Sequence, residues 1–198
     1  VEAFLDAIDV AEPAITGLSM GGALALGHAL DVAPVERLVL VNSYGLGTDA
    51  IWRTAASGLL QTPLVGNMVW QGLSTSKPAI RTGLRSMTAT EPPQQLVEDV
   101  HSVVDRWTVR AMRRWHRDEF RREGFKTNYT DRLGELSVPT LFIHGDEDPL
   151  LPPSWSRQAA TKVQESELHL IDNCGHNPPR ERPERFNSAV RSFCVTGV

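Results

Sequence analysis

The segment Gly17-Leu18-Ser19-Met20-Gly21 is the strongest indication of the fold of this chain. An apolar run, Pro13-Ala14-Ile15-Thr16, precedes it, and a run rich in Ala and Leu follows it. This order predicts a strand, a tight turn and a helix, with Ser19 at the tip of the turn. A residue at such a tip adopts a strained backbone, so its neighbours must be small, and Gly17 and Gly21 supply that room. We therefore predict a Ser19 hydroxyl that stands clear of a sheet.

The composition is that of an ordinary globular protein. The chain has 198 residues, 41% of them hydrophobic and 22% charged, and a net charge of −4. This balance indicates neither nucleic acid nor a membrane as a partner, and no apolar run reaches the roughly 18 residues of a membrane-spanning helix. The two cysteines, Cys174 and Cys194, form neither a metal-ligand pattern nor a secreted disulfide framework. With no basic leader segment at Val1, we expect a cytoplasmic protein with reduced thiols.

Strand and helix patterns alternate over residues 1–43 and again over residues 137–198. Continuous apolar runs such as 37–42 are typical of strands that are buried on both faces. Strands that alternate with helices predict a parallel sheet, so we assign both ranges to one α/β core. In addition to the strand that leads to the Ser19 turn, we predict helices at 1–9, 21–30, 154–163 and 183–194 and strands at 37–42, 138–144 and 167–171.

Residues 44–136 lack this alternation. We find no convincing strand pattern there, and helical segments separated by Gly, Pro and Thr take its place. We predict that these residues form a helical cap, or lid, inserted into the α/β core. Its predicted helices cover 49–60, 64–73, 77–87, 93–104 and 106–122.

A serine hydroxyl needs a base that accepts its proton and a third group that orients the base. The predicted strand 138–144 runs into a turn that contains Asp146 and Asp148, and the strand 167–171 runs into His176. The chain order is therefore serine, acid, histidine. On a parallel sheet this order is that of the α/β-hydrolases and differs from the orders of other serine hydrolases.

On these residues the chain resembles the α/β-hydrolases, a large family that includes esterases, lactonases, proline iminopeptidases and carbon–carbon bond hydrolases. The resemblance implies a parallel sheet covered by helices, with residues 44–136 as the variable helical cap of the family. It implies a small-molecule substrate that enters between sheet and cap, and no metal or cofactor. The matching segments are Gly17–Gly22, Pro139–Asp148, Gly175–Pro178, Glu181 and Pro183.

The resemblance also implies a role for each matching residue. Ser19 is the expected nucleophile, His176 is the expected general base and acid, and Asp148 is expected to orient His176. The family's acid stands three places after a glycine, which selects Asp148, while Asp146 in the same turn is a rival for this role. The backbone N–H of Met20 is the expected oxyanion-hole donor.

The remaining polar and aromatic residues receive structural interpretations. We expect the Met and Trp residues of the cap to form its core, with lining of the substrate pocket as the alternative. We expect the arginines of 106–121 to form a solvated face rather than an anion-binding stripe. The other histidines are expected to be structural or solvated: His28, His101, His116, His144 and His169.

The resemblance predicts a serine hydrolase that cleaves a carboxylic ester or a similar acyl bond through an acyl-enzyme. A carbon–carbon bond hydrolase of the ring-cleavage-product type is an alternative, because the loop 43–47 is similar to loops of those enzymes. Those enzymes usually carry a tryptophan just after the catalytic histidine, and this chain has Asn177 there. A second alternative is an inactive hydrolase-like fragment that serves as a binding module.

The family has several strands before the nucleophile strand, and a His-Gly loop among them supplies a second oxyanion donor. Nothing before Gly17 supplies either feature, and the chain starts with Val1. We therefore expect the C-terminal portion of a longer enzyme, with impaired activity. The nucleophile strand is then expected to lie at an exposed edge of the sheet, which makes self-association plausible.

Overall fold

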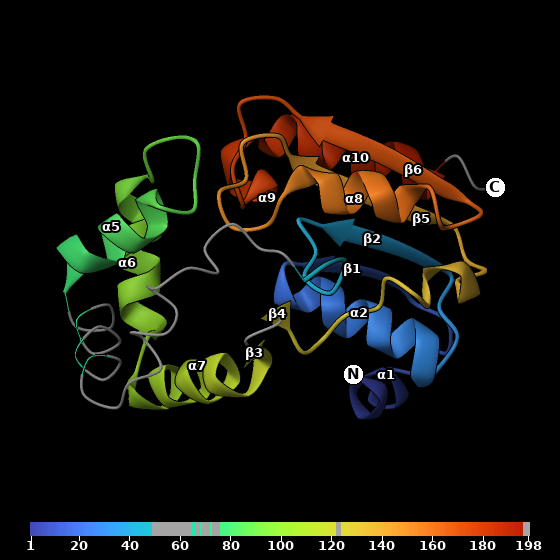
Figure 1. Cartoon of the computed structure of the whole chain (residues 1–198), viewed down its shortest axis with the longest axis horizontal. Helices are drawn as coiled ribbons and strands as arrows, with labels where there is room; N and C mark the ends of the chain where they lie inside the picture. The colour runs from blue at the N-terminus through green and yellow to red at the C-terminus, as the bar shows by residue number, and fades with distance from the viewer. Residues whose placement is uncertain (49–64, 66–67, 69–71, 73–75, 122–123, 196–198) are drawn as a thin grey trace.

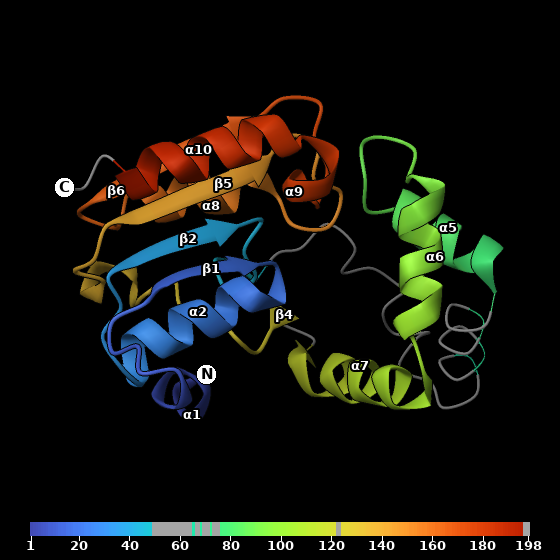
Figure 2. The same cartoon turned by 180° about the vertical axis from the view of Figure 1, so that it is seen from behind.

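The computed structural model describes residues 1–48, 65, 68, 72, 76–121 and 124–195. A parallel sheet of four strands, in the order β1-β2-β5-β6, lies at its centre (Figure 1). Helices cover both faces of this sheet (Figures 1 and 2), which confirms the predicted α/β fold. The strands are β1 (Ala14–Leu18), β2 (Arg37–Val41), β5 (Thr140–Gly145) and β6 (Ser166–Ile171).

The central strands have helices on both faces because their side chains are apolar on both faces. Leu38 and Leu40 of β2 join a core cluster with residues of α2 (Met20–Asp31) and α8 (Pro153–Ala160). The alternate residues of β2 pack instead with α10 (Pro183–Val195), which lies on the opposite face. Successive strand residues point to opposite faces, so one apolar run serves both layers.

β1 is an edge strand in the part of the chain that the structure describes. It pairs with β2 alone, and the register runs from Ala14 opposite Arg37 to Leu18 opposite Val41. The short helix α1 (Glu2–Ala7) precedes β1 and buries none of its residues. The strand that leads to Ser19 is thus unpaired along one side, as predicted.

A group of helices lies beyond the carboxyl ends of the strands, to one side of the sheet (Figure 2). It consists of α5 (Lys77–Arg85), α6 (Gln94–Val103) and α7 (Arg106–Glu119). The predicted helices at 77–87, 93–104 and 106–122 agree with these, whereas those at 49–60 and, for the most part, 64–73 lie outside the described residues.

The prediction that residues 44–136 contain no strand was wrong in one place. β3 (Phe120–Arg121) and β4 (Gly124–Phe125) pair in an antiparallel ladder. Each strand has two residues, which is too short to produce an alternating pattern. The 3-10 turn Leu133–Glu135 then leads the chain back to β5, and the helix α9 (Pro178–Glu181) follows β6.

Candidate active site

The turn between β1 and α2 holds Ser19 in a strained backbone conformation, with φ 52° and ψ −117°. A Cβ atom on Gly17 would lie 2.3 Å from the backbone oxygen of Gly21, and one on Gly22 would lie 2.1 Å from Ser43 Oγ. A Cβ on Gly21 would meet nothing within 4 Å. The steric prediction therefore holds for Gly17 and was wrong for Gly21, because the second close approach occurs at Gly22.

Three predicted residues meet at the carboxyl end of the sheet. Nε2 of His176 lies 2.9 Å from Ser19 Oγ, and Nδ1 of His176 lies 2.8 Å from Asp148 Oδ2. A proton on Nδ1 would be donated to the carboxylate, which leaves Nε2 free to accept the hydroxyl proton of Ser19. The rival carboxylate, Asp146, points elsewhere and accepts a bond from the backbone N–H of Cys174.

Asp148 is buried, yet its surroundings favour the carboxylate. Burial alone raises the pKa of Asp148, but hydrogen bonds from His144, His176 and Asn42 outweigh it and hold the pKa well below its usual value. Asn42 Nδ2 donates to Asp148 Oδ2 over 2.6 Å, and the backbone N–H groups of 150 and 151 donate to Oδ1. The group facing Nδ1 of His176 is thus an anion at neutral pH.

Asn42 is a site residue that no sequence motif predicted. It directly follows β2, is fully buried and has a positive φ of 41°. Its Oδ1 accepts the N–H of Gly145, and its Nδ2 also donates to the backbone oxygen of Gly175. An asparagine that ends a buried apolar strand is a sequence signal for such a position, because Asn tolerates a left-handed backbone.

His144 was expected to serve in packing alone, and the structure shows more. The buried ring bonds to Ser156 Oγ through Nδ1 (2.7 Å) and to the backbone oxygen of Leu151 through Nε2 (3.1 Å). Nε2 also lies 3.3 Å from Asp148 Oδ2. His144 therefore connects α8 to the carboxylate that faces His176.

Glu181 holds the loop that carries His176. Its carboxylate accepts hydrogen bonds from three backbone N–H groups: Ala89 (2.8 Å), Gly175 (3.1 Å) and Asn177 (3.0 Å). The N–H of His176 itself donates to the backbone oxygen of Met87, just after α5. A Cβ on Gly175 would lie 2.5 Å from the Ala89 nitrogen, so this close approach requires glycine. The histidine loop is thereby fastened to the chain that follows α5.

Cys174 lies beside this loop and is fully buried, whereas Cys194 is exposed. Burial, with a smaller contribution from Glu181, raises the pKa of the Cys174 thiol to about 12. Both cysteines are free, and the buried one is held as an unreactive thiol.

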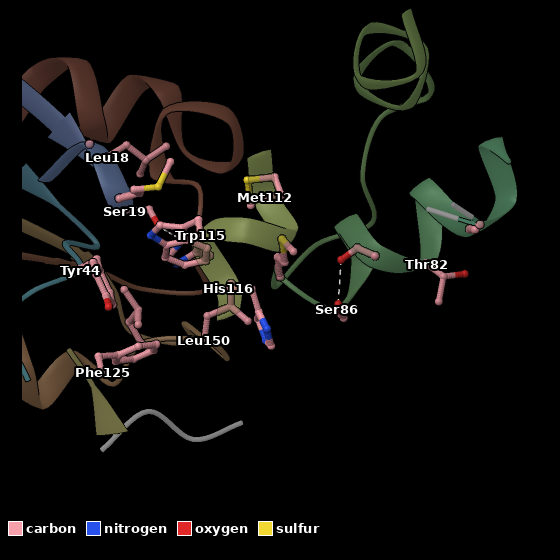
Figure 3. Close-up of a pocket in the computed structure, with 18 of the residues that line it drawn as sticks. Leu18, Ser19, Tyr44, Thr82, Ser86, Met112, Trp115, His116, Phe125 and Leu150 are labelled. Atoms are coloured by element: carbon pink, nitrogen blue, oxygen red, sulfur yellow. Dashed lines mark hydrogen bonds between the residues drawn. The ribbon is translucent and has the colours of Figure 1, made fainter. Parts of the chain in front are cut away.

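A cavity of about 1050 Å³ lies beside Ser19 and His176 (Figure 3). Its walls come from the strand ends of the core on one side and from α5 and α7 on the other. No Asp, Glu, Lys or Arg is among the described residues that line it. The lining residues from ranges 1–44 and 137–198 are Leu18, Ser19, Met20, Gly21, Tyr44, Leu150, Leu151 and His176. Those from residues 65–125 are Met68, Gly72, Ala79, Thr82, Gly83, Ser86, Met87, Met112, Trp115, His116 and Phe125.

Among the described residues, helix α7 contributes three side chains to this cavity. Met112 and Trp115 line it, which is the second of the two roles expected for them, and Trp107 is 58% exposed. His116, expected to be structural or solvated, is buried in the cavity wall, and burial lowers the pKa of its imidazole. Arg114 and Arg117 do project into solvent, as expected. The sequence could not separate these faces because helical periodicity does not say which neighbour a face meets.

Met20 is the first residue of α2. The first N–H groups of a helix have no acceptor within it, so the Met20 N–H is available beside Ser19. The positive end of the helix dipole lies at the same place. This geometry suits an anion that develops on a group bonded to Ser19 Oγ.

The model of the alpha/beta hydrolase family matches residues 1–189 of the chain. A 2-hydroxy-6-oxononadienedioate/2-hydroxy-6-oxononatrienedioate hydrolase of Paraburkholderia xenovorans is 30% identical, over 98% of this chain and 65% of that protein. A 2-hydroxymuconate semialdehyde hydrolase of Pseudomonas sp. strain CF600 is 28% identical, over 96% of this chain and 64% of that protein. The chain thus spans about 65% of the length of these curated relatives.

Solved structures show the same fold. A meta-cleavage product hydrolase of Pseudomonas fluorescens IP01 aligns with a TM-score of 0.76 and 25% identity, over 98% of this chain and 69% of that one. An esterase of Exiguobacterium antarcticum aligns with a TM-score of 0.73 and 17% identity, over 97% of this chain and 70% of that one. In the described part of the chain, we find no helix with the length and apolar character needed to cross a membrane.

Proposed function

Since this chain belongs to the alpha/beta hydrolase family, we propose that it is a serine hydrolase with Ser19 as its nucleophile. His176 is the general base and Asp148 the orienting carboxylate. The observation that carries this proposal is the run of short contacts from Ser19 Oγ through the imidazole of His176 to Asp148, 2.9 Å and 2.8 Å long. Residues 44–136 act as a cap over the cavity.

The proposed reaction has two halves. Ser19 Oγ bonds to the carbonyl carbon of an ester while its proton passes to Nε2 of His176. The imidazolium then protonates the leaving oxygen as the C–O bond breaks, and the acyl group stays on Ser19. In the second half His176 takes a proton from water, whose oxygen attacks the acyl carbon. The bond between that carbon and Ser19 Oγ then breaks, the imidazolium returns the proton to Oγ, and the acid is released. The Met20 N–H stabilises the oxyanion in both halves.

A carbon–carbon bond hydrolase is the second candidate. The observation in its favour is that the similar structure from Pseudomonas fluorescens IP01 is named a meta-cleavage product hydrolase, and that curated relatives are named as hydrolases of 2-hydroxy-6-oxo dienoates and of 2-hydroxymuconate semialdehyde. In such a reaction water supplies a hydroxyl group to a carbonyl carbon and a proton to the carbon that departs. Ser19 and His176 can serve this chemistry from the same positions.

The experiment compares the wild-type chain with Ser19→Ala, and uses Ser86→Ala as a matched control in the same cavity. We expect wild type and Ser86→Ala to hydrolyse p-nitrophenyl acetate and to gain one adduct from a fluorophosphonate. Ser19→Ala should lose the adduct and about a thousandfold of the rate. A parallel assay follows the loss of absorbance of 2-hydroxy-6-oxo-6-phenylhexa-2,4-dienoate, the substrate in the name of one relative. Equal rates in wild type and Ser19→Ala, without any adduct, would contradict the proposal.

A further inference from the structure

The cavity beside Ser19 has walls without charge in the described part of the chain. Aliphatic, aromatic and thioether groups dominate them, and Met112, Trp115 and Phe125 line the cavity together with Ser19 (Figure 3). The polar side-chain groups of the described wall beyond Ser19 and His176 are three hydroxyl groups, the imidazole of His116 and the indole N–H of Trp115, and none of them is an Asp, Glu, Lys or Arg. The cavity is at the upper end of the size range of small-molecule sites, so it can enclose a large apolar group.

Those hydroxyl groups are already engaged with the protein. Thr82 Oγ1 donates to the backbone oxygen of Pro78 (3.0 Å), and Ser86 Oγ donates to that of Gly83 (2.7 Å). Both bonds lie within α5 or at its end, so each hydroxyl already has an acceptor for its proton. The wall that faces Ser19 from α5 therefore has little left with which to solvate an anion.

Tyr44 is engaged in the same way. Its hydroxyl donates to Glu119 Oε2 over 2.6 Å, and the same carboxylate accepts two bonds from Thr127. Burial and this carboxylate raise the pKa of Tyr44, so the phenol stays neutral. Burial also lowers the pKa of His116, which favours its neutral imidazole. None of these groups offers a positive charge to a ligand near neutral pH.

We propose that this cavity takes the apolar, uncharged acyl chain of an ester and rejects an acyl chain that ends in a carboxylate. A buried carboxylate without a cationic or hydrogen-bonding partner loses its hydration without compensation. Each methylene group buried in an apolar wall instead strengthens binding about fourfold. The inference rests on the proposed function, because Ser19 must attack the carbonyl at the near end of the chain.

The experiment measures Ser19-dependent kcat/KM for two p-nitrophenyl esters of equal chain length. One is the octanoate and the other is the mono-ester of octanedioic acid, whose chain ends in a carboxylate. We expect the octanoate to be preferred about a hundredfold, with the acetate as a reference that does not reach the far wall. A ratio near one, or a preference for the carboxylate, overturns the inference alone. Absence of any Ser19-dependent cleavage overturns the proposed function and this inference with it.

A pair of variants locates the charge discrimination in the cavity. Met112→Arg places a cation on the cavity face of α7, and Ala111→Arg places the same side chain on its exposed face. We expect Met112→Arg to lower the octanoate preference about tenfold and Ala111→Arg to leave it unchanged. An equal change in both variants would show a general effect of added charge and would contradict the cavity assignment. The wild-type ratio tests the proposal even if Met112→Arg does not fold.

Discussion

Asn42 joins three loops at the carboxyl end of the sheet. It bonds at once to Asp148, to the N–H of Gly145 and to the backbone oxygen of Gly175. Its left-handed backbone aims the amide into this group, and its side chain is fully buried. Asn42 therefore links the carboxylate that faces His176 to the end of the neighbouring strand, in addition to the backbone N–H groups of 150 and 151 that hold its other oxygen.

We expect Asn42→Ala to lower the free energy of unfolding by about 2–4 kcal/mol, because it leaves buried partners unpaired and places Ala in the left-handed region. Asn173→Ala is the matched control, since Asn173 also has a positive φ (53°) but is exposed. The control should lose only about 1 kcal/mol, the cost of the left-handed backbone. Denaturant unfolding measures both, and equal losses would mean that the buried bonds of Asn42 add no stability.

The lowered pKa of Asp148 predicts how the stability of the fold depends on pH. This pKa is lowered in the folded chain, so the folded state favours the carboxylate more than the unfolded state does. The resulting stability is fully present above the unfolded pKa of about 3.9 and is lost as pH falls toward the lower folded pKa. We expect the stability advantage of wild type over Asp148→Asn to be constant at neutral pH and to shrink below about pH 4.

Urea unfolding of the two chains between about pH 7 and about pH 3 measures this advantage. Asp146→Asn, in the same turn, controls for the general loss of one negative charge. An advantage of wild type that does not change over this range would contradict the lowered pKa of Asp148.

At the scale of elements, α9 ends in the carboxylate that fixes the histidine loop. Glu181→Ala removes the acceptor of three backbone N–H groups, including that of Ala89 after α5. We expect this variant to lose about 1–3 kcal/mol of stability, and to react with a fluorophosphonate at Ser19 about tenfold more slowly, because His176 is no longer held. Glu184→Ala, exposed in the first turn of α10, should change neither quantity. Equal labelling rates in both variants would show that the loop keeps its position without Glu181.

The sequence predicted the elements of the core well, because long apolar and amphipathic runs mark them. The run 37–42 became β2 and the helix 183–194 became α10 with nearly the same bounds. The β3–β4 ladder was missed because its strands have two residues each. Helix α1 forms where it was predicted, but none of its residues is buried. The alternation of apolar and acidic residues in this helix therefore does not correspond to a buried face.

The part of the candidate site that could be predicted is the serine, acid and histidine, because they follow one another along the chain in the order of the family. The serine turn and the histidine follow from short motifs, and their meeting point follows from parallel strands that end at one edge. Three features depend on contacts between segments far apart in sequence: the separation of Asp148 from Asp146, the hydrogen bond from Asn42 to Asp148, and the place of His116 in the cavity wall. No local pattern carries that information.

At the scale of the whole molecule, the two edges of the sheet differ. The exposed residues of β6 include Glu167 and His169, whose side chains approach to 3.6 Å. The exposed residues of β1, Ala14 and Thr16, carry no charge. Charged side chains discourage the pairing of an edge with another chain, so within the described residues β1 is the edge with less protection against association.

We propose that this chain, on its own, self-associates through β1. Thr16→Lys should shift the sedimentation distribution toward the monomer, because pairing would bring two lysines together in a confined ladder. His169→Lys, on the opposite edge, should leave the distribution unchanged. A wild-type chain that sediments as a monomer at high concentration would contradict the proposal.

The buried thiol of Cys174 is a natural reporter of how often the loop that carries His176 opens. Cys194 should react at once with a thiol reagent in the native protein, whereas Cys174, with a raised pKa and no exposure, should react only when the loop leaves its place. The rate of the second modification therefore counts the openings of the loop that carries His176, without any added label. Binding of a ligand in the neighbouring cavity would lower the rate of Cys174 modification. The affinity of an unknown substrate can therefore be measured before its reaction is known.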